Sequence, residues 1–166
     1  EISQALVNRF GVTPEVAAQA AMLADGNYAE AVSALSETDE HVSFLGHFQS
    51  FMRLAVKFDT QKVLQWIDEN AATGREKQKQ FLQYSLQIFR DCLMFNYGDP
   101  ALVKLSGEEK QFLEKFAPFV NRRNFEKLVE EFNSSYYYVE RNANPKILFM
   151  DLLFTTRELL NLRQGA

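Results

Sequence analysis

Short helices rich in alanine are predicted at the start of the chain. The spacing of apolar positions indicates a first helix over residues 2–10, which a glycine follows. Thr13 and Pro14 are typical of the cap and first turn of a second helix. Asn27, with Glu30 three residues later, has the pattern of a capping box that begins a third helix. Their small apolar side chains predict that the three helices pack closely together.

Longer helices with aromatic inner faces are predicted from Thr38 onward. Apolar residues recur there at helical spacing as far as Phe58, and Thr60 is expected to cap the next helix. Gly74 separates that helix from a long one, which ends at a loop over residues 97–100. Further helices are expected over residues 107–116, 124–140 and 145–162. No stretch of the sequence alternates in the way that predicts a strand.

The last predicted helix carries more apolar surface than a helix needs to face one core. Asn144 suits its N-cap and Pro145 its first position. One apolar stripe comprises Leu148, Leu152, Leu159 and Leu162, with Thr155 between them. A second stripe, about a quarter-turn further round, comprises Phe149, Leu153 and Leu160. Either this is the central helix of a large core, or it packs its own domain on one stripe and a partner on the other.

These patterns together predict an all-α protein of two domains. Residues 1–37 are expected to form a small three-helix domain, and residues 38–166 a larger helical bundle. The boundary is expected at residues 36–40, where the apolar periodicity lapses into Ser-Glu-Thr-Asp-Glu.

Composition supports a helical, water-soluble protein. Among the 166 residues, 46% are hydrophobic and 15 are Phe, whereas only 4 are Pro and 7 are Gly, so breaks in the helices are few. No apolar run is long enough to span a membrane. The single Cys92 falls among core-facing positions, as is typical of a small core residue in a reducing cytoplasm. A cytoplasmic location is therefore expected, and a chain that begins at Glu1 is expected to be an excised piece of a longer protein.

Motifs for catalysis or cofactor binding do not emerge from the sequence. It contains neither a phosphate-binding glycine loop followed by Lys nor a dinucleotide-binding glycine motif. His41 and His47 are six residues apart and so lie on different faces of a helix, which does not suit a shared metal ion. A net charge of −4 argues against broad nucleic-acid binding. We therefore expect no catalytic residue, no metal ligand and no cofactor in this chain.

Two groups of residues resemble one known protein family. Residues 9–11 (Arg-Phe-Gly) and 24–27 (Ala-Asp-Gly-Asn), with Ala31, resemble the three-helix lid of a clamp-loader AAA+ module. Residues 141–146 (Arg-Asn-Ala-Asn-Pro-Lys), followed by an apolar helix, are similar to the collar domain of the delta-prime subunits of the bacterial DNA polymerase III clamp loader. The resemblance covers both ends of the chain in the expected order and, more loosely, the aromatic helices between them.

This resemblance implies a role in DNA replication. It implies an AAA+ ATPase-like domain upstream of this chain, and a collar that joins other collars in a five-subunit ring. That ring opens the sliding clamp and loads it on primed DNA. The parent protein would be a subunit of DNA-directed DNA polymerase III, a nucleotidyltransferase (transferase) complex. The implied partners are the other clamp-loader subunits, with the clamp and DNA reached only through the complex; neither a membrane nor a small-molecule substrate is expected.

One position in the lid distinguishes among the subunits of this family. The ATP-binding subunits of this family carry a motif similar to Gly-Asp-x-Arg-Arg-Ala. At the corresponding residues 26–31, this chain has Gly-Asn-Tyr-Ala-Glu-Ala. The resemblance puts Ala29 where those subunits carry an Arg that reaches the nucleotide phosphates. An Ala cannot make that contact. The position therefore favours a delta-prime-like subunit without ATP turnover of its own over the gamma/tau motor subunit.

A subunit interface is expected from the resemblance together with the pattern of the last helix. Its residues are predicted to be Tyr137, Tyr138, Phe149, Leu153 and Leu160. An alternative from another class of protein is a ubiquitin-associated-like interaction module fused to a helical scaffold. It explains residues 2–35 about as well as the lid does, but it says nothing about residues 142–160.

Overall fold

The computed structural model describes residues 2–24, 27–103, 105 and 107–162, and the side chains of these residues except 23 and 33–43. Every regular element within them is a helix and none is a strand, which confirms the predicted all-α class. The chain divides into two compact units, Glu1–Gly46 and His47–Ala166, described here separately. None of the helices in the described part of the chain is long and apolar enough to cross a membrane.

The first unit is built from α1 (Ile2–Phe10), α2 (Pro14–Leu23) and the beginning of α3 (Tyr28–Val56). Gly11, with a φ of 65°, ends α1 in the left-handed conformation that glycine adopts without strain. The unit's core is made almost entirely of small side chains: Leu6, Ala17, Ala20, Ala24 and Ala31. The predicted close packing of short alanine-rich helices is therefore observed.

Helix α3 differs from the expected arrangement. It runs without interruption from Tyr28 to Val56, so the expected division after residue 37 falls inside a helix. The compact units instead divide after Gly46. The lapse in apolar periodicity at residues 36–40 indicated a loss of burial, but no Gly or Pro lies between Tyr28 and Leu45 to end the helix there.

The second unit contains the end of α3 and all of the later helices. These are α4 (Thr60–Ala72), α5 (Arg75–Tyr97), the 3-10 turn η1 (Pro100–Leu102), α6 (Gly107–Phe116), the 3-10 turn η2 (Ala117–Phe119), α7 (Phe125–Glu140) and α8 (Pro145–Leu160). The cap of α4 is Asp59 and not the expected Thr60, because the Asp59 carboxylate accepts a hydrogen bond from the Lys62 N–H at 3.1 Å.

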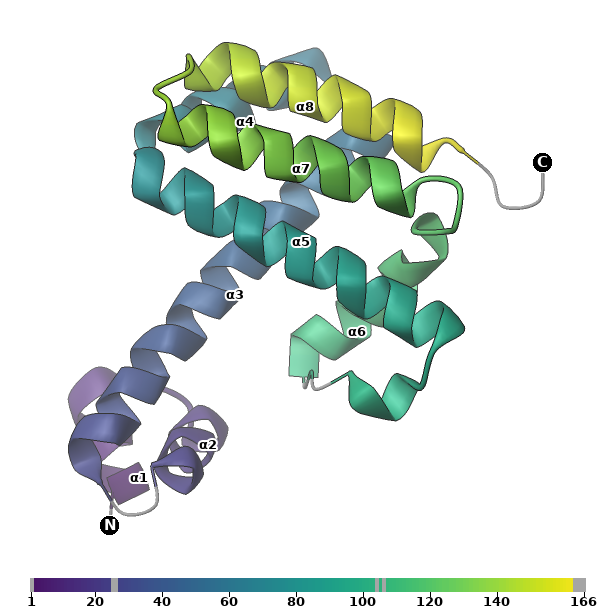
Figure 1. Cartoon of the computed structure of the whole chain (residues 1–166). Helices are drawn as coiled ribbons and strands as arrows, with labels where there is room; N and C mark the ends of the chain where they lie inside the picture. The colour runs from purple at the N-terminus through teal and green to yellow at the C-terminus, as the bar shows by residue number, and fades with distance from the viewer. Residues whose placement is uncertain (1, 25–26, 104, 106, 163–166) are drawn as a thin grey trace. The chain divides into compact units, whose positions relative to one another are not determined.

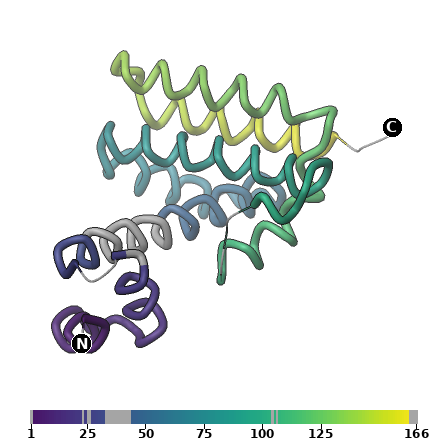
Figure 2. Tube along the Cα trace, turned by 60° about the horizontal axis from the view of Figure 1, so that its bottom comes forward, coloured from purple at the N-terminus to yellow at the C-terminus, as the bar shows by residue number. Residues whose placement is uncertain are grey.

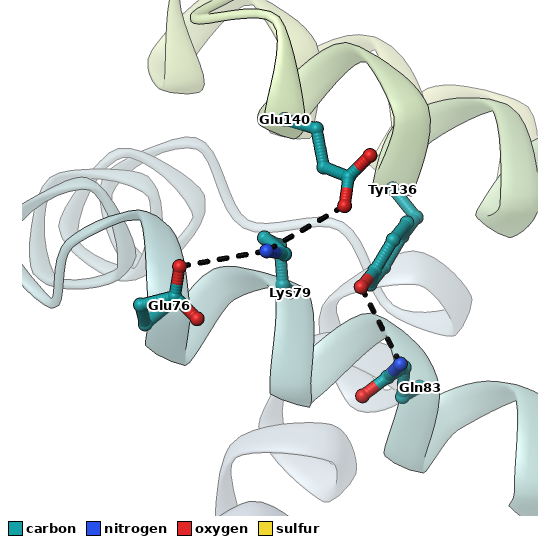
Figure 3. A network of polar contacts seen from close by, with 5 residues as sticks. All are labelled: Glu76, Lys79, Gln83, Tyr136 and Glu140. Carbon is teal, nitrogen blue, oxygen red and sulfur yellow. Dashed lines mark hydrogen bonds and ion pairs between the residues drawn. The ribbon is translucent and has the colours of Figure 1, made fainter.

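Helix α7 lies between α5 and α8 and runs antiparallel to both (Figure 1). The turned view shows the same three helices side by side (Figure 2). Helix α4 packs against α8. A surface network of polar side chains joins α5 to α7 (Figure 3). In it, the Lys79 ammonium lies 3.4 Å from Glu76 on its own helix and 3.6 Å from Glu140 on α7.

Aromatic rings fill the centre of the second unit. Phe51 packs against Trp66, Phe81 and Phe132, with ring centroids 5.0, 5.9 and 6.1 Å away. These four residues come from α3, α4, α5 and α7, so one cluster joins four helices. Aromatic pairs at these separations contribute beyond the area they bury. Seven of the 15 phenylalanines of the sequence are buried in the second unit.

Two buried asparagines join the start of α7 to the end of α8. The Asn124 side chain donates hydrogen bonds to the Phe119 carbonyl at 2.8 Å and to the Leu159 carbonyl at 3.0 Å. Its Oδ1 accepts from the Asn121 N–H at 2.9 Å, and the Asn121 side chain donates to the Leu162 carbonyl. These side chains add to the backbone bonds at the end of α8, where the Leu159 carbonyl also accepts from the Leu162 N–H at 3.1 Å.

Candidate functional site

The junction between α7 and α8 is formed by the motif at residues 141–146. Asn142 has a φ of 61°, a left-handed conformation that Asn tolerates better than most residues and that turns the chain after α7. The Asn144 side chain then accepts hydrogen bonds from the N–H groups of Lys146 and Ile147, and Pro145 occupies the first turn. The predicted cap and start of this helix are confirmed.

Tyr137 and Tyr138 lie near the end of α7, one turn before this junction. Their side chains are 50% and 51% exposed, and their rings meet edge to face with centroids 5.8 Å apart. The Arg141 guanidinium lies 3.6 Å from the centroid of the Tyr137 ring. This stacking holds the Tyr137 ring in place while leaving half of its surface open to solvent. The pair is thus an accessible aromatic surface of the kind enriched at protein interfaces.

The predicted second face of α8 is corrected by the structure. Phe149 and Leu153 are 0% exposed, and Leu160 is buried as well, so none of the three presents an apolar surface to a partner. Leu152 and Leu159 are also buried. The two expected stripes form a single wide apolar face, which is ordinary for a helix that packs against the core of a globular unit. Of the two arrangements left open by the sequence, the structure has the core helix.

A different part of α8 is exposed. Ile147 and Phe154 lie seven residues apart, and so on one side of the helix, and they are 71% and 46% exposed. The Phe154 ring stacks on Phe58 with centroids 5.5 Å apart. Sequence reasoning missed these two residues, although their position opposite Phe149 on the helical wheel was a usable signal. They are the apolar surface that α8 offers to solvent.

Arg157 of α8 explains how the adjacent end of α3 is held. Its guanidinium donates hydrogen bonds to the carbonyls of Ala55 and Val56 at 2.9 and 3.1 Å. Those carbonyls belong to the last turn of α3, where no further helical N–H is available to them. The guanidinium also lies 5.8 Å from the centroid of the Phe58 ring. Arg157 thus caps the end of α3.

Ala29 lies in the first unit, in the first turn of α3, and its side chain is exposed. Its N–H donates a hydrogen bond to the Asn27 side chain at 3.1 Å, as expected for a helix that begins at Asn27. Glu30 beside it is also exposed. The position that the resemblance aligns with a phosphate-contacting Arg therefore offers no cationic group.

His47 and Cys92, the histidine and the cysteine of the second unit, are engaged in its core. The His47 ring stacks on Trp66 at 4.4 Å, and its Nε2 donates a hydrogen bond to the Asn70 Oδ1 at 2.9 Å. Burial lowers the pKa of His47, with a smaller opposing effect from the Asn70 hydrogen bond. Cys92 is fully buried, and burial raises the pKa of its thiol, so that it remains protonated. Its predicted core position is confirmed.

No cluster of three or more His, Cys, Asp or Glu side chains is arranged to hold a metal ion in the part of the chain that the structure describes. Comparisons of the chain with protein-family models, with curated proteins and with solved structures found no match.

Proposed function

We propose that this chain is the C-terminal part of a delta-prime-like subunit of a bacterial clamp loader. In this proposal the first unit is the AAA+ lid and the second is the collar through which the subunit joins a five-membered ring. The ring places the sliding clamp on primed DNA during replication. The observation that carries the proposal is the motif at residues 141–146, which forms the turn and the Asn144 cap from which α8 begins.

Two features of the fold support this assignment. A small three-helix unit precedes a larger helical unit, in the order that the family requires. Ala29 occupies the position of the phosphate-contacting Arg in the ATP-binding subunits, and the exposed side chain next to it is the acidic Glu30. A position with this chemistry cannot stabilise a nucleotide phosphate. The chain therefore serves the ring as a stator without ATP turnover of its own.

The collar contact is assigned to the aromatic surface of Tyr137 and Tyr138. Both are half exposed, and stacking on Arg141 orders the first of them before any partner arrives. An ordered aromatic side chain loses little conformational freedom on binding, which favours its use as an anchor. Phe149, Leu153 and Leu160 are not part of this contact, because the core of the chain already covers them.

Assembly from purified components tests the proposal. The chain is mixed with the delta-type and gamma/tau-type clamp-loader subunits of the same organism, and the mass of the resulting complex is measured by sedimentation velocity. We expect one copy of the chain in a five-subunit complex. A chain that remains at its own mass in this mixture would contradict the proposal. If it instead binds immobilised ubiquitin, the ubiquitin-associated-like alternative for the first unit is favoured.

A further inference from the structure

The second unit has a groove lined by the end of α3, by α6 and by η2. None of its lining residues belongs to the Tyr137–Tyr138 surface. The groove has a volume of about 520 Å³, within the usual range for ligand-binding clefts. Its lining combines apolar side chains (Met52, Val56, Phe112, Phe116 and Phe119) with polar ones (Gln49, Arg53, Glu108, Gln111 and Lys115). The core of the unit does not fill this space, so it is available to a binding partner.

Three phenylalanine rings form a preformed apolar wall in the groove. Phe112 and Phe116 stack with centroids 5.3 Å apart and an angle of 12° between their planes, and Phe119 continues the stack 6.0 Å from Phe116. Phe48 braces the first two rings from behind, edge-on, at 5.8 and 5.5 Å. Phe119 is 40% exposed, so the open end of the stack faces solvent. A rigid wall of this kind suits an apolar side chain of a partner.

The charged side chains at the groove indicate which charge a binding partner carries. Arg53 and Lys115 are both exposed, and the side chain of neither makes an ion pair or hydrogen bond with any residue that the structure describes. Glu108 is the only carboxylate among the residues that line the groove. The lining therefore carries an excess of positive charge, although the chain as a whole has a net charge of −4. A partner that brings a carboxylate together with an apolar side chain complements both features.

We propose that this groove binds an amphipathic, acidic peptide segment of another protein. An aromatic or aliphatic side chain of the segment packs on the wall formed by Phe112, Phe116 and Phe119, and an Asp or Glu of the segment lies between Arg53 and Lys115. Amphipathic segments commonly bind with their apolar face in hydrophobic grooves of this type. A nucleic-acid strand is disfavoured, because a row of phosphates requires more cations than these two and would meet Glu108. The proposal does not depend on the clamp-loader assignment, since it rests on the groove alone.

Selection from a random peptide display library tests the proposal directly. The library is panned on the whole chain and counter-selected against the double variant Arg53→Glu/Lys115→Glu. Both substituted side chains are exposed, so the variant is expected to fold normally. We expect the enriched peptides to share an Asp or Glu close to a large apolar residue. Failure to enrich any peptide that distinguishes the two proteins, or enrichment of peptides without an acidic residue, would overturn the proposal.

Affinities of one selected peptide, measured by fluorescence polarisation, provide the quantitative test. The Arg53→Glu/Lys115→Glu variant should bind at least about tenfold more weakly, the factor that corresponds to 1.4 kcal/mol. The control Arg90→Glu/Lys127→Glu makes the same change in net charge on exposed residues outside the groove and should bind normally. A peptide with Lys in place of its acidic residue should recover affinity for the groove variant. Equal binding to all three proteins would contradict the assignment of the cations.

Two further measurements separate the wall from the charges and peptide from nucleic acid. Phe119→Ala should weaken peptide binding by roughly tenfold or more if this ring is an anchor, with the thermal melt confirming that the protein still folds. Ile147→Ala removes an even more exposed apolar side chain elsewhere and serves as the control. A labelled oligothymidylate is titrated in parallel. If it binds in a manner sensitive to the Arg53 and Lys115 substitutions and no peptide does, the groove is a nucleic-acid site and the proposal is wrong.

Discussion

Truncation of Phe149 to alanine is the perturbation that most sharply distinguishes a core helix from a partner-facing one. The Phe149 side chain is completely buried, with its ring centroid 6.1 Å from that of Trp66 and 6.3 Å from that of Phe81. Removing a fully buried phenyl ring costs about 3–5 kcal/mol, from lost transfer free energy and the cavity left behind. Because domains of this kind are stabilised by only about 5–15 kcal/mol, that loss is a large share of the total.

Trp66 makes this measurement specific to the second unit. It is the only Trp of the chain and lies against the site of the substitution. Its fluorescence should report a fall in the melting temperature of roughly 10–20 °C for Phe149→Ala. The matched control is Phe154→Ala on the same helix, which removes a half-exposed ring and should shift the melt much less. If both variants melt like the wild-type protein, Phe149 is not a core residue and the account of α8 is wrong.

Three further predictions follow from named groups in the structure. Burial lowers the pKa of His47 in the folded state below the ordinary value of 6.5, so the unfolded chain binds the proton more readily. The free energy of unfolding should therefore decrease as the pH falls below about 6.5, and urea titrations should show a weaker decrease in this range for His47→Phe. Asn124→Leu leaves the Phe119 carbonyl and the Asn121 N–H without their hydrogen bonds, while the Leu159 carbonyl keeps that of the Leu162 N–H; it should destabilise the second unit by about 2 kcal/mol or more, whereas the same change at the exposed Asn133 should have little effect in urea unfolding. Ala31→Leu overfills the small core of the first unit and should cost about 1–3 kcal/mol, visible in circular dichroism as an earlier loss of helix without a change in the Trp66 transition, whereas Leu at the exposed Ala29 should be tolerated.

Helix ends were predictable wherever a residue leaves the backbone little choice. Asn144 and Pro145 fix the start of α8, and Gly74 precedes α5, because caps, proline and glycine act through local geometry. The division between the units was not predictable in the same way. Residues 36–40 lose their apolar pattern, but a solvated helix and a linker share that pattern, and the chain there contains no breaker.

The candidate contact surface was predictable only in part, and for a physical reason. Tyr137 and Tyr138 lie outside the buried core, and both are half exposed. Phe149 and Leu153 could not be assigned from the helical wheel, because the width of the buried face of α8 depends on which helices pack around it. Helix α8 packs against α7 and α4, and members of both expected stripes are buried: Leu152 and Leu159 of the first, and Phe149, Leu153 and Leu160 of the second. The groove beside Arg53 likewise depends on the packing of helices distant in sequence.

The affinity of the chain for the delta-type and gamma/tau-type clamp-loader subunits tests the proposed function most directly. Sedimentation equilibrium is measured for the wild-type protein, for Tyr137→Ala/Tyr138→Ala and for the control Leu64→Ala, which removes an equally exposed apolar side chain on α4. We predict that the tyrosine variant retains the wild-type melting temperature but binds about 30-fold more weakly, as a loss of about 2 kcal/mol requires. The control should bind normally. Unchanged affinity in the tyrosine variant, or no association of the wild-type chain at all, would contradict the claim that this collar surface assembles the loader.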